Sequence, residues 1–352
     1  MKFLLQTQIG IEKITELELL DIFKKDHSID YVGYIPQKNG IVQIEWKDEH
    51  YLQFYNELGT IEDAFFVLDY VKDIDIKYNL KTIYQKINLE RIRKNLDFFF
   101  DKVNPFDNAK RFRFVTRKKA GNEFRRIDLE NSIKDLFDKK FQRVEVTDEE
   151  GVKEIWTTLV KNRLIIAIRL TTKEKRHRYY KTEAVHGSLR PTVAYAMAYV
   201  AEPHAKDTIW DPFCGAGTIG CELSEKFKFN RLILSDISEE ATTITKTNLT
   251  HLTSFKKTKS KISIRQEDFF SSKSFADMII SNLPFGHQYS TNADFINHFF
   301  QKLKATPHVR KVALLYPNPI EGHADWQLTR KFQIRVLGRE AWLMVLQRRQ
   351  DK

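Results

Sequence analysis

The segment SNLPFG, residues 281–286, ends an apolar run with an amide, a proline and an aromatic ring. The exocyclic amine of a nucleobase is a poor nucleophile, because its lone pair is delocalised into the ring. If the Asn282 amide and the Leu283 carbonyl both accept from this NH₂ group, they favour its pyramidalisation and aim the lone pair at a methyl donor. Pro284 stiffens the turn, and Phe285 offers a flat face on which a base can stack. A tight turn capped by Asn, with Phe in the core, is the alternative.

The stretch DPFCGAGTIG, residues 211–220, places Gly215, Gly217 and Gly220 in a G-x-G-x-x-G arrangement between an expected strand and an expected helix. The glycines let the backbone turn tightly and approach a ligand. Asp236 ends the next expected strand, where a carboxylate can accept hydrogen bonds from both ribose hydroxyls. Taken alone, these features also fit a nicotinamide dehydrogenase or a βα turn without a ligand.

Two further acids favour a cationic ligand. Asp211 ends the first strand of this half and puts negative charge where a pyrophosphate would gain nothing from it. The sulfonium and amino group of S-adenosylmethionine suit that charge. Asp268, in RQEDFF, ends the third strand and is a candidate acceptor for an adenine amine, although a helix cap or turn residue is the alternative. Because successive strand ends share one edge of a parallel sheet, S-adenosylmethionine is the favoured cofactor.

The elements that must position these residues alternate in type. From residue 186 to 352, short apolar strands alternate with helices, which indicates a parallel sheet covered on both faces. Residues 1–70 read as a small α/β unit, and a second α/β unit follows over 71–172, with one helix expected across 80–100. Residues 173–185 are charged and poor in aliphatic residues, which favours a connector.

Composition limits the partner and the compartment. The chain of 352 residues has a formal net charge of +11 and a pI near 9.3, which favour a nucleic-acid partner. Two cysteines, Cys214 and Cys221, and no His/Cys/Asp cluster with metal-ligand spacing argue against a disulfide framework and a metal site. No apolar run is long enough to span a membrane, and early acids interrupt any signal-peptide core. We therefore expect a cytoplasmic protein without metal or membrane partner.

Two basic stretches are candidates for contact with RNA phosphates. Residues 110–126, KRFRFVTRKKAGNEFRR, interleave cations with aromatics and contain one acid, Glu123. Strand alternation would place part of this stretch on one exposed face, although a solvated edge strand is the alternative. The connector KEKRHRYY, residues 173–180, is similar. The residues expected to bind RNA are Lys110, Arg111, Arg113, Arg117, Lys118, Lys119, Arg125, Arg126, Lys175, Arg176 and Arg178.

The segments DPFCGAGTIG, SDIS, EDFF and SNLPFG together resemble the amino-directed methyltransferases that carry an Asn/Asp-Pro-Pro-Tyr-type motif. The layout before them is similar to the THUMP-domain RNA methyltransferases that make N2-methylguanosine. The resemblance implies an α/β fold in which a ferredoxin-like unit (1–70), a THUMP RNA-binding domain (71–172) and a basic linker (173–185) precede a Rossmann-like class I methyltransferase domain (186–352). Leu283 departs from the family, since many relatives have proline there, but the backbone carbonyl survives that change.

The resemblance also implies the site residues. Asp236 would hold the ribose, Asp268 the adenine, and residues 282–285 the target guanine. Arg190 would pair with the cofactor carboxylate, whereas an ordinary helix start explains Pro191 equally well. The residues implied to bind the cofactor are Ser188, Leu189, Arg190, Pro191, Asp211, Phe213, Cys214, Gly215, Ala216, Gly217, Thr218, Asp236, Ile237, Asp268, Phe269 and Asn282.

These features predict an S-adenosylmethionine-dependent enzyme that methylates the N2 amine of a guanosine in structured RNA, with tRNA favoured over ribosomal RNA. Three alternatives stay open: N6 methylation of adenine in nucleic acid, a non-catalytic RNA-binding protein, and a nicotinamide enzyme. Methylation at cytosine C5 is disfavoured, because it needs a cysteine nucleophile within a different constellation.

Overall fold

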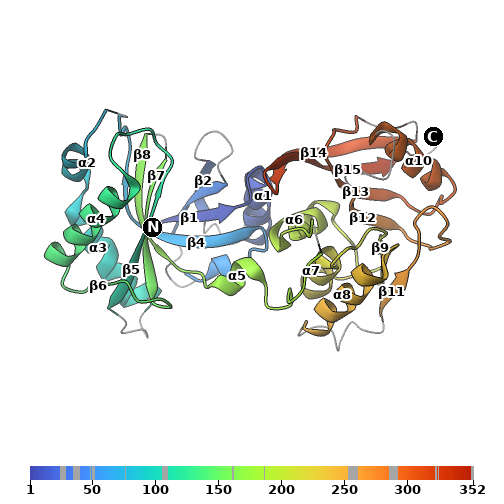
Figure 1. Ribbon diagram of the computed structural model, residues 1–352, viewed down its shortest axis with the longest axis horizontal. Helices are drawn as coiled ribbons and strands as arrows, with labels where there is room; N and C mark the ends of the chain where they lie inside the picture. Colours follow the sequence, from blue (N-terminus) through green and yellow to red (C-terminus); the bar gives the residue numbers. More distant parts are fainter. Residues whose placement is uncertain are drawn as a thin grey trace.

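The structure is a computed structural model that describes residues 1–23, 29–34, 40–47, 49, 52–75, 77–104, 110–160, 162–185, 187–252, 261–284, 292–321, 323 and 325–349. These residues form two β-sheets, which lie towards opposite ends of an elongated molecule (Figure 1). The helices α1 (Glu12–Phe23) and α6 (Pro191–Ala201) lie between the two sheets.

The N-terminal sheet has eight strands in the order β2-β3-β1-β4-β8-β7-β5-β6. The antiparallel pairing of β4 with β8 joins the strands before residue 72 to those after residue 110. The sequence pattern does not predict β4, whose side chains are buried on both faces. The strands are β1 (Lys2–Thr7), β2 (Ile29–Tyr34), β3 (Ile41–Trp46), β4 (Ile61–Val71), β5 (Arg111–Lys118), β6 (Glu145–Thr147), β7 (Lys153–Val160) and β8 (Arg163–Arg169).

Helices α2 (Leu80–Lys86), α3 (Leu89–Phe98) and α4 (Arg126–Lys140) pack on one face of this sheet over an aromatic core. The expected single helix across residues 80–100 is wrong. Asn88 adopts an extended backbone, and its side chain accepts a hydrogen bond from the Arg91 N–H. This is an N-cap, so one helix ends and another begins there. A turn of π-helix, Phe99–Val103, follows α3.

The C-terminal sheet has the strand order β11-β10-β9-β12-β13-β15-β14. The first five strands are parallel, and β15 is antiparallel to both of its neighbours, so the sheet is mixed rather than wholly parallel. A two-residue turn with positive φ at Leu337 and Gly338 reverses the chain between the last two strands. The strands are β9 (Thr208–Asp211), β10 (Arg231–Asp236), β11 (Ile262–Gln266), β12 (Met278–Asn282), β13 (Lys311–Tyr316), β14 (Trp326–Val336) and β15 (Arg339–Arg348).

Both faces of this second sheet are buried, as the sequence predicts. On one face Ile209 and Ile280 pack in a core with α6 and with α7 (Thr218–Lys226). On the other face Trp210 and Ile279 pack against α10 (Asn292–Lys304). Adjacent strand residues point to opposite faces, so apolar residues are needed at consecutive positions. Helix α8 (Glu239–Thr250) follows β10.

The two halves of the chain are tied together at several points. Ile11 and Ile14 of α1 belong to the same core as α6. The Arg335 N–H of β14 donates to the Ile9 carbonyl at 2.8 Å, and the Gln8 side chain donates to the Arg335 carbonyl at 2.7 Å. The basic linker adds a short helix, α5 (Lys173–His177), beside β4. Across the described ranges, no helix has the length and apolarity needed to cross a membrane.

Candidate active site

The strand register brings the predicted acids and the amide to one edge of the C-terminal sheet. Asp211 ends β9 and pairs with Leu234 of β10, and Asp236 ends β10. Asn282 ends β12, the neighbour of β9 on the other side. Asp268 follows β11 by two residues, on the far side of β10. The carboxyl ends of four adjacent parallel strands therefore carry these side chains.

The glycine loop between β9 and α7 depends on its glycines. Gly215 and Gly217 have φ of +52° and +72°, in the left-handed region that favours glycine. A Cβ at Gly217 would lie 2.8 Å from the Thr245 side chain of α8. The Thr245 hydroxyl in turn donates to the Gly215 carbonyl at 2.7 Å. Gly220 lies close to Leu234, which a Cβ would approach to 2.5 Å. Helix α7 and strand β10 therefore pack closer together than a side chain at residue 220 would allow.

Asp211 is buried beneath this loop. Its Oδ1 accepts hydrogen bonds from the Ser281 hydroxyl at 2.6 Å and from the Phe213 N–H at 3.3 Å. Burial raises the pKa of Asp211 to about 7, the two hydrogen bonds oppose this rise, and the negative charge of Asp236 adds to it. The two carboxylates are therefore electrostatic neighbours. Asp211 is 1% exposed, and its expected role towards a cofactor stays a prediction.

Asp236 is partly exposed at the loop. Its Oδ2 accepts from the Gly215 N–H at 2.9 Å, and its Oδ1 accepts from the Ser238 N–H at 3.0 Å. Ile237, the next residue, is 65% exposed beside it. Asp268 forms a turn: its Oδ2 accepts from the Ser271 N–H at 3.1 Å. The turn that the sequence left as an alternative for Asp268 therefore exists, and the carboxylate remains partly exposed.

Asn282 is the most informative residue of the edge. Its amide Oδ1 is buried and has no hydrogen-bond partner within the described part of the chain. Leu283 is fully buried, and its N–H donates to the Leu315 carbonyl of β13 at 3.1 Å, which extends the strand by one residue. Pro284 is exposed. Phe285, the predicted stacking ring, lies outside the described residues.

The remaining loop residues are mostly buried. Phe213 contacts Phe269, with ring centroids 5.4 Å apart, and Phe269 packs in the core on the α10 side of the sheet. Ala216 and Thr218 are buried at the start of α7. Burial raises the pKa of the Cys214 thiol well above its ordinary value, and the nearby Asp211 raises it further. A thiol in this state is a poor nucleophile, which agrees with the exclusion of cytosine C5 chemistry.

The segment before α6 makes contacts with both halves. The Ser188 hydroxyl accepts from the Val185 N–H at 3.0 Å, and Leu189 is buried. Pro191 is the first residue of α6, as a helix-starting proline. Arg190 pairs with Glu62 of β4 at 2.6 Å. Its expected role towards a cofactor carboxylate stays a prediction, and the contact with the N-terminal half was not foreseen.

Most of the predicted RNA-binding cations of residues 110–126 have partners inside the protein. Arg111, Arg113, Arg125 and Arg126 form ion pairs with Glu149, Glu150, Asp128 and Glu130. Lys118 donates to the carbonyls of Ala120 and Asn122. Arg117 donates to Gln6. Lys110 and Lys119 are exposed, and within the described residues no hydrogen bond or ion pair engages their side chains.

The cations of the basic linker lie at the joint between the halves. Arg176 pairs with Asp63 of β4. Arg178 pairs with the buried Glu222 of α7 at 3.0 Å and donates to the Gly59 carbonyl at 2.8 Å. Lys175 donates to the Asn56 carbonyl at 3.0 Å. Arg178 therefore connects the two halves, whereas Lys175 and Arg176 tie the linker to the N-terminal half. A role in RNA binding for the three residues stays a prediction.

Sequence reasoning missed two groups that support the site. Ser281 bonds to Asp211, and the signal for it is a hydroxyl that directly precedes Asn282 in an otherwise apolar strand. Thr245 holds the glycine loop from α8, and no pattern in the sequence links these two segments. In the part of the chain that the structure describes, no group of three or more His, Cys, Asp or Glu side chains is arranged to hold a metal ion.

Part of the chain is similar to known methyltransferases. Residues 178–311 match the family described as UPF0020: RMKL-like, methyltransferase domain. Mouse tRNA (guanine(6)-N(2))-methyltransferase THUMP3 is 41% identical over 69 residues, which is 20% of this chain and 14% of the relative. Human U6 snRNA (guanine-N(2))-methyltransferase THUMPD2 is 32% identical over 132 residues, 37% of this chain and 25% of the relative. The chain therefore matches a quarter or less of the length of these relatives.

Solved structures match over the whole chain. TrmN from Thermus thermophilus has a TM-score of 0.73 at 18% identity, covering 99% of both chains. SMU.472, solved in complex with SAH, has a TM-score of 0.72 at 14% identity, covering 100% of this chain and 99% of the other. These likenesses show an α/β fold of the class I methyltransferase type with mixed sheets. Over residues 178–311 the chain is similar to the RMKL-like methyltransferase domain.

Proposed function

We propose that the chain is an S-adenosylmethionine-dependent RNA methyltransferase that acts on the exocyclic N2 amine of a guanosine, with tRNA as the favoured substrate. The observation that carries this proposal is the buried Asn282 Oδ1, which lacks a hydrogen-bond partner among the described residues. Such an acceptor costs about 1–3 kcal/mol unless a ligand supplies a donor. An exocyclic amine supplies that donor. The named activities of the two relatives favour guanine N2 over adenine N6.

The residues at the sheet edge fit the cofactor. S-adenosylmethionine supplies a methyl group carried on a positively charged sulfur. We place the methionine part at the loop 211–218, the ribose at Asp236 and the adenine near Ile237 and Asp268. Among the described residues, one backbone N–H donates to each Asp236 oxygen, so lone pairs remain for two ribose hydroxyls. A cation at the loop also offsets the repulsion between Asp236 and Asp211.

The protein's own contribution to the reaction is orientation. The Ser281 hydroxyl ties β12 to Asp211, which fixes the strand end that presents Asn282. The Asn282 amide oxygen then accepts from the target amine, and the Leu283 carbonyl is the proposed second acceptor. The Leu283 side chain is fully buried, which fixes the position of the backbone next to Asn282. Holding the nitrogen in this way favours a pyramidal geometry without a strong base at the site.

We further propose that the N-terminal half grips the RNA. It is interpreted as a ferredoxin-like unit (1–70), a THUMP domain (71–172) and a basic linker (173–185), followed by the methyltransferase domain (186–352). A net charge of +11 supports an RNA partner. Both cysteines are free and buried, which supports a reducing, cytoplasmic location.

The test is a transfer assay. The full chain is incubated with methyl-labelled S-adenosylmethionine and separate pools of tRNA and ribosomal RNA, and the labelled RNA is digested to nucleosides. We expect label in tRNA as N2-methylguanosine. N6-methyladenosine would overturn the target amine, and label in ribosomal RNA alone would overturn the substrate. Cofactor binding without transfer to any RNA would leave a non-catalytic RNA-binding protein.

A further inference from the structure

One face of the N-terminal sheet carries an apolar cluster to which no described helix contributes. Helices pack on the other face, where Phe3 and Phe66 lie in the main core. Because side chains alternate along a strand, Leu4, Phe65 and Trp156 point to the opposite face and form a separate cluster made of strand residues. These side chains are themselves buried, with Leu4 5%, Phe65 6% and Trp156 8% exposed, so a partner can reach this face only where a pocket opens in it.

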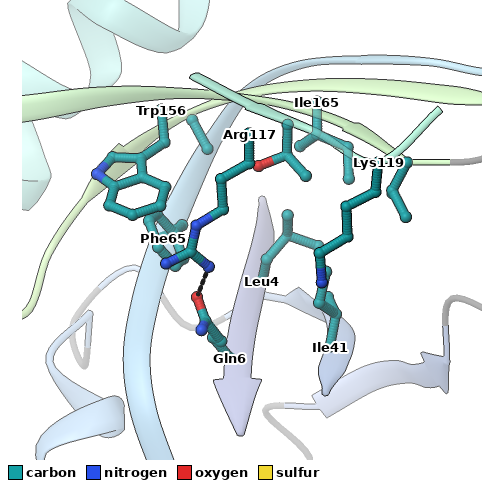
Figure 2. A pocket seen from close by; sticks show the side chains of 11 residues that line it. Leu4, Gln6, Ile41, Phe65, Arg117, Lys119, Trp156 and Ile165 are labelled. Carbon is teal, nitrogen blue, oxygen red and sulfur yellow. Dashed lines mark hydrogen bonds between the residues drawn. The ribbon is translucent and has the colours of Figure 1, made fainter. Parts of the chain in front are cut away.

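A pocket opens on this face, and two cations flank it (Figure 2). Leu4, Ile41 and Ile165 supply apolar lining from three different strands. Arg117 and Lys119 extend into the same space from β5 and the residue that follows it, with Arg117 between Trp156 and Lys119 (Figure 2). An apolar surface bounded by cations is unsuited to a purely apolar ligand, because the two charges would be desolvated without compensation.

The Arg117 guanidinium is held in a fixed position. Its carbon lies 4.3 Å from the ring centroid of Trp156, and Nη1 donates to the Gln6 amide oxygen at 2.9 Å. The Trp156 ring is held in turn, because its Nε1–H donates to Glu154 at 2.7 Å. One face of the guanidinium is thus used by the indole. The pocket lies beside Arg117 on the side of Lys119, where a second flat group can stack.

The neighbouring acids do not neutralise these two cations directly. Glu62 and Asp63 lie near Arg117, but they pair with Arg190 and Arg176 respectively. Glu154 pairs with Arg169. Lys119 is exposed at the pocket. The pocket therefore presents positive charge to a ligand. The Arg117 guanidinium, on which a base can stack, is already held in position.

We propose that this pocket binds one unpaired nucleotide of the RNA substrate, with its base stacked on Arg117 and its phosphate beside Lys119. The inference rests on the proposed RNA-directed function and adds an RNA subsite in the N-terminal half. A stacked base uses the guanidinium face and the apolar lining, and the phosphate uses the exposed ammonium. Stacking reads no base edge, so the subsite accepts any of the four bases.

The test measures binding of a fluorescein-labelled unpaired hexaribonucleotide to the full chain by fluorescence anisotropy. An abasic hexamer with the same sugar–phosphate backbone is the matched ligand. We expect the abasic hexamer to bind about tenfold more weakly, because stacking is lost. Trp156→Leu should weaken binding of the intact hexamer by a similar factor and leave binding of the abasic hexamer almost unchanged. Arg117→Gln also removes a positive charge, so it should weaken binding of the intact hexamer more than binding of the abasic hexamer.

Two further variants separate this site from general charge. Lys119→Gln removes an exposed cation, so it tests the phosphate contact without disturbing packing, and it should lower the salt dependence of binding. Lys139→Gln removes the same charge from α4, on the helical face of the sheet, and should bind as the wild type does. A thermal-unfolding midpoint confirms that each variant is folded.

Equal binding of the intact and abasic hexamers, or wild-type affinity in folded Arg117→Gln and Lys119→Gln, would overturn the subsite even if the enzyme methylates RNA. Conversely, base-dependent binding that these variants weaken would support the subsite even if the wild-type protein transferred no methyl group. The absence of methyl transfer would remove only the proposed catalytic function. Failure of the subsite and failure of the proposed function can therefore be told apart.

Discussion

At the residue scale, the site combines the Asn282 Oδ1, an acceptor without a partner among the described residues, with the buried acid Asp211, whose pKa is raised to about 7 by burial and further by the charge of Asp236. Ser281, the residue directly before Asn282, donates its hydroxyl to Asp211. The sequence was sufficient to predict the amide and the acids as a set, because each ends a strand. It was not sufficient to predict that Asp211 is buried and bonded to Ser281, since burial depends on the packing of β12 against β9.

Asn282→Ala should lower the rate of methyl transfer at least about a hundredfold, the cost of removing one preorganised polar contact to the reacting group. Affinity for S-adenosylmethionine, measured by calorimetry, should stay within about threefold of the wild type, because the cofactor contacts proposed at the loop 211–218, at Asp236 and at Asp268 are all retained. A variant that transfers at the wild-type rate would remove the orientation mechanism.

Cofactor affinity should depend on pH through Asp211. Its folded pKa is raised from 3.8 to about 7, so it holds a proton below that pH and is ionised above it. The positively charged sulfonium is attracted to the ionised carboxylate, so affinity for S-adenosylmethionine should increase as the pH rises towards about 7. The total increase should be about tenfold for each unit by which cofactor binding lowers the pKa of Asp211. SAH has no sulfonium charge and should show a weaker pH dependence. Calorimetry between about pH 5 and pH 8 checks this, and Asp211→Asn should abolish the difference between the two ligands.

At the scale of elements, the alternation of strands and helices in the C-terminal half was predictable because each strand is short, apolar and followed by a helix. The element that escaped prediction, β4, contains Glu62, Asp63 and Asp69 in an otherwise apolar run. Their partners, Arg190, Arg176 and Arg91, come from distant segments. A sequence pattern cannot show that a buried acid is paired, so the run does not resemble a core strand.

Two glycines with positive φ, Gly217 in the glycine loop and Gly338 in the turn between β14 and β15, should differ in how much an alanine destabilises the protein. Gly338→Ala, at φ +82° with open space around the new Cβ, should cost about 1–2 kcal/mol of unfolding free energy from backbone strain alone. Gly217→Ala has a similar strain at φ +72° and also forces the new Cβ to 2.8 Å from Thr245. It should therefore be less stable than Gly338→Ala in urea titrations and should bind S-adenosylmethionine more weakly. Equal urea midpoints for the two variants would contradict this prediction and would show that Thr245 of α8 moves away from the new Cβ at little cost.

At the scale of the whole molecule, the basic linker was the part least predictable from sequence. Net charge indicated an RNA contact, but charge alone does not reveal which cations have acidic partners in the fold. Arg176 pairs with Asp63 and ties the linker to the N-terminal sheet. Arg178 pairs with Glu222 and also donates to the Gly59 carbonyl, so its positive charge holds the two halves together. Glu222 is 1% exposed and is also bonded by the Tyr180 hydroxyl.

Arg178→Met should reduce the unfolding free energy by about 3 kcal/mol or more, because it leaves the buried Glu222 carboxylate without its cation. Adding Glu222→Gln should recover much of this loss. Arg143→Met, which removes an exposed cation paired with Asp97 and Asp101, is the matched control and should cost less than about 1 kcal/mol. Urea midpoints of the four proteins check this prediction, and it would be contradicted by a double variant no more stable than Arg178→Met.

The hydrogen bond from Arg335 to Ile9 has a consequence for biosynthesis. Its partners are separated by almost the whole chain, and Gln8 reaches the same residue across 327 positions of sequence. On a translating ribosome, the first sheet and α1 emerge long before β14 exists. The docking surface around residues 8–14 therefore stays uncovered until β14 has been synthesised, and the two halves of the chain can join only after that point.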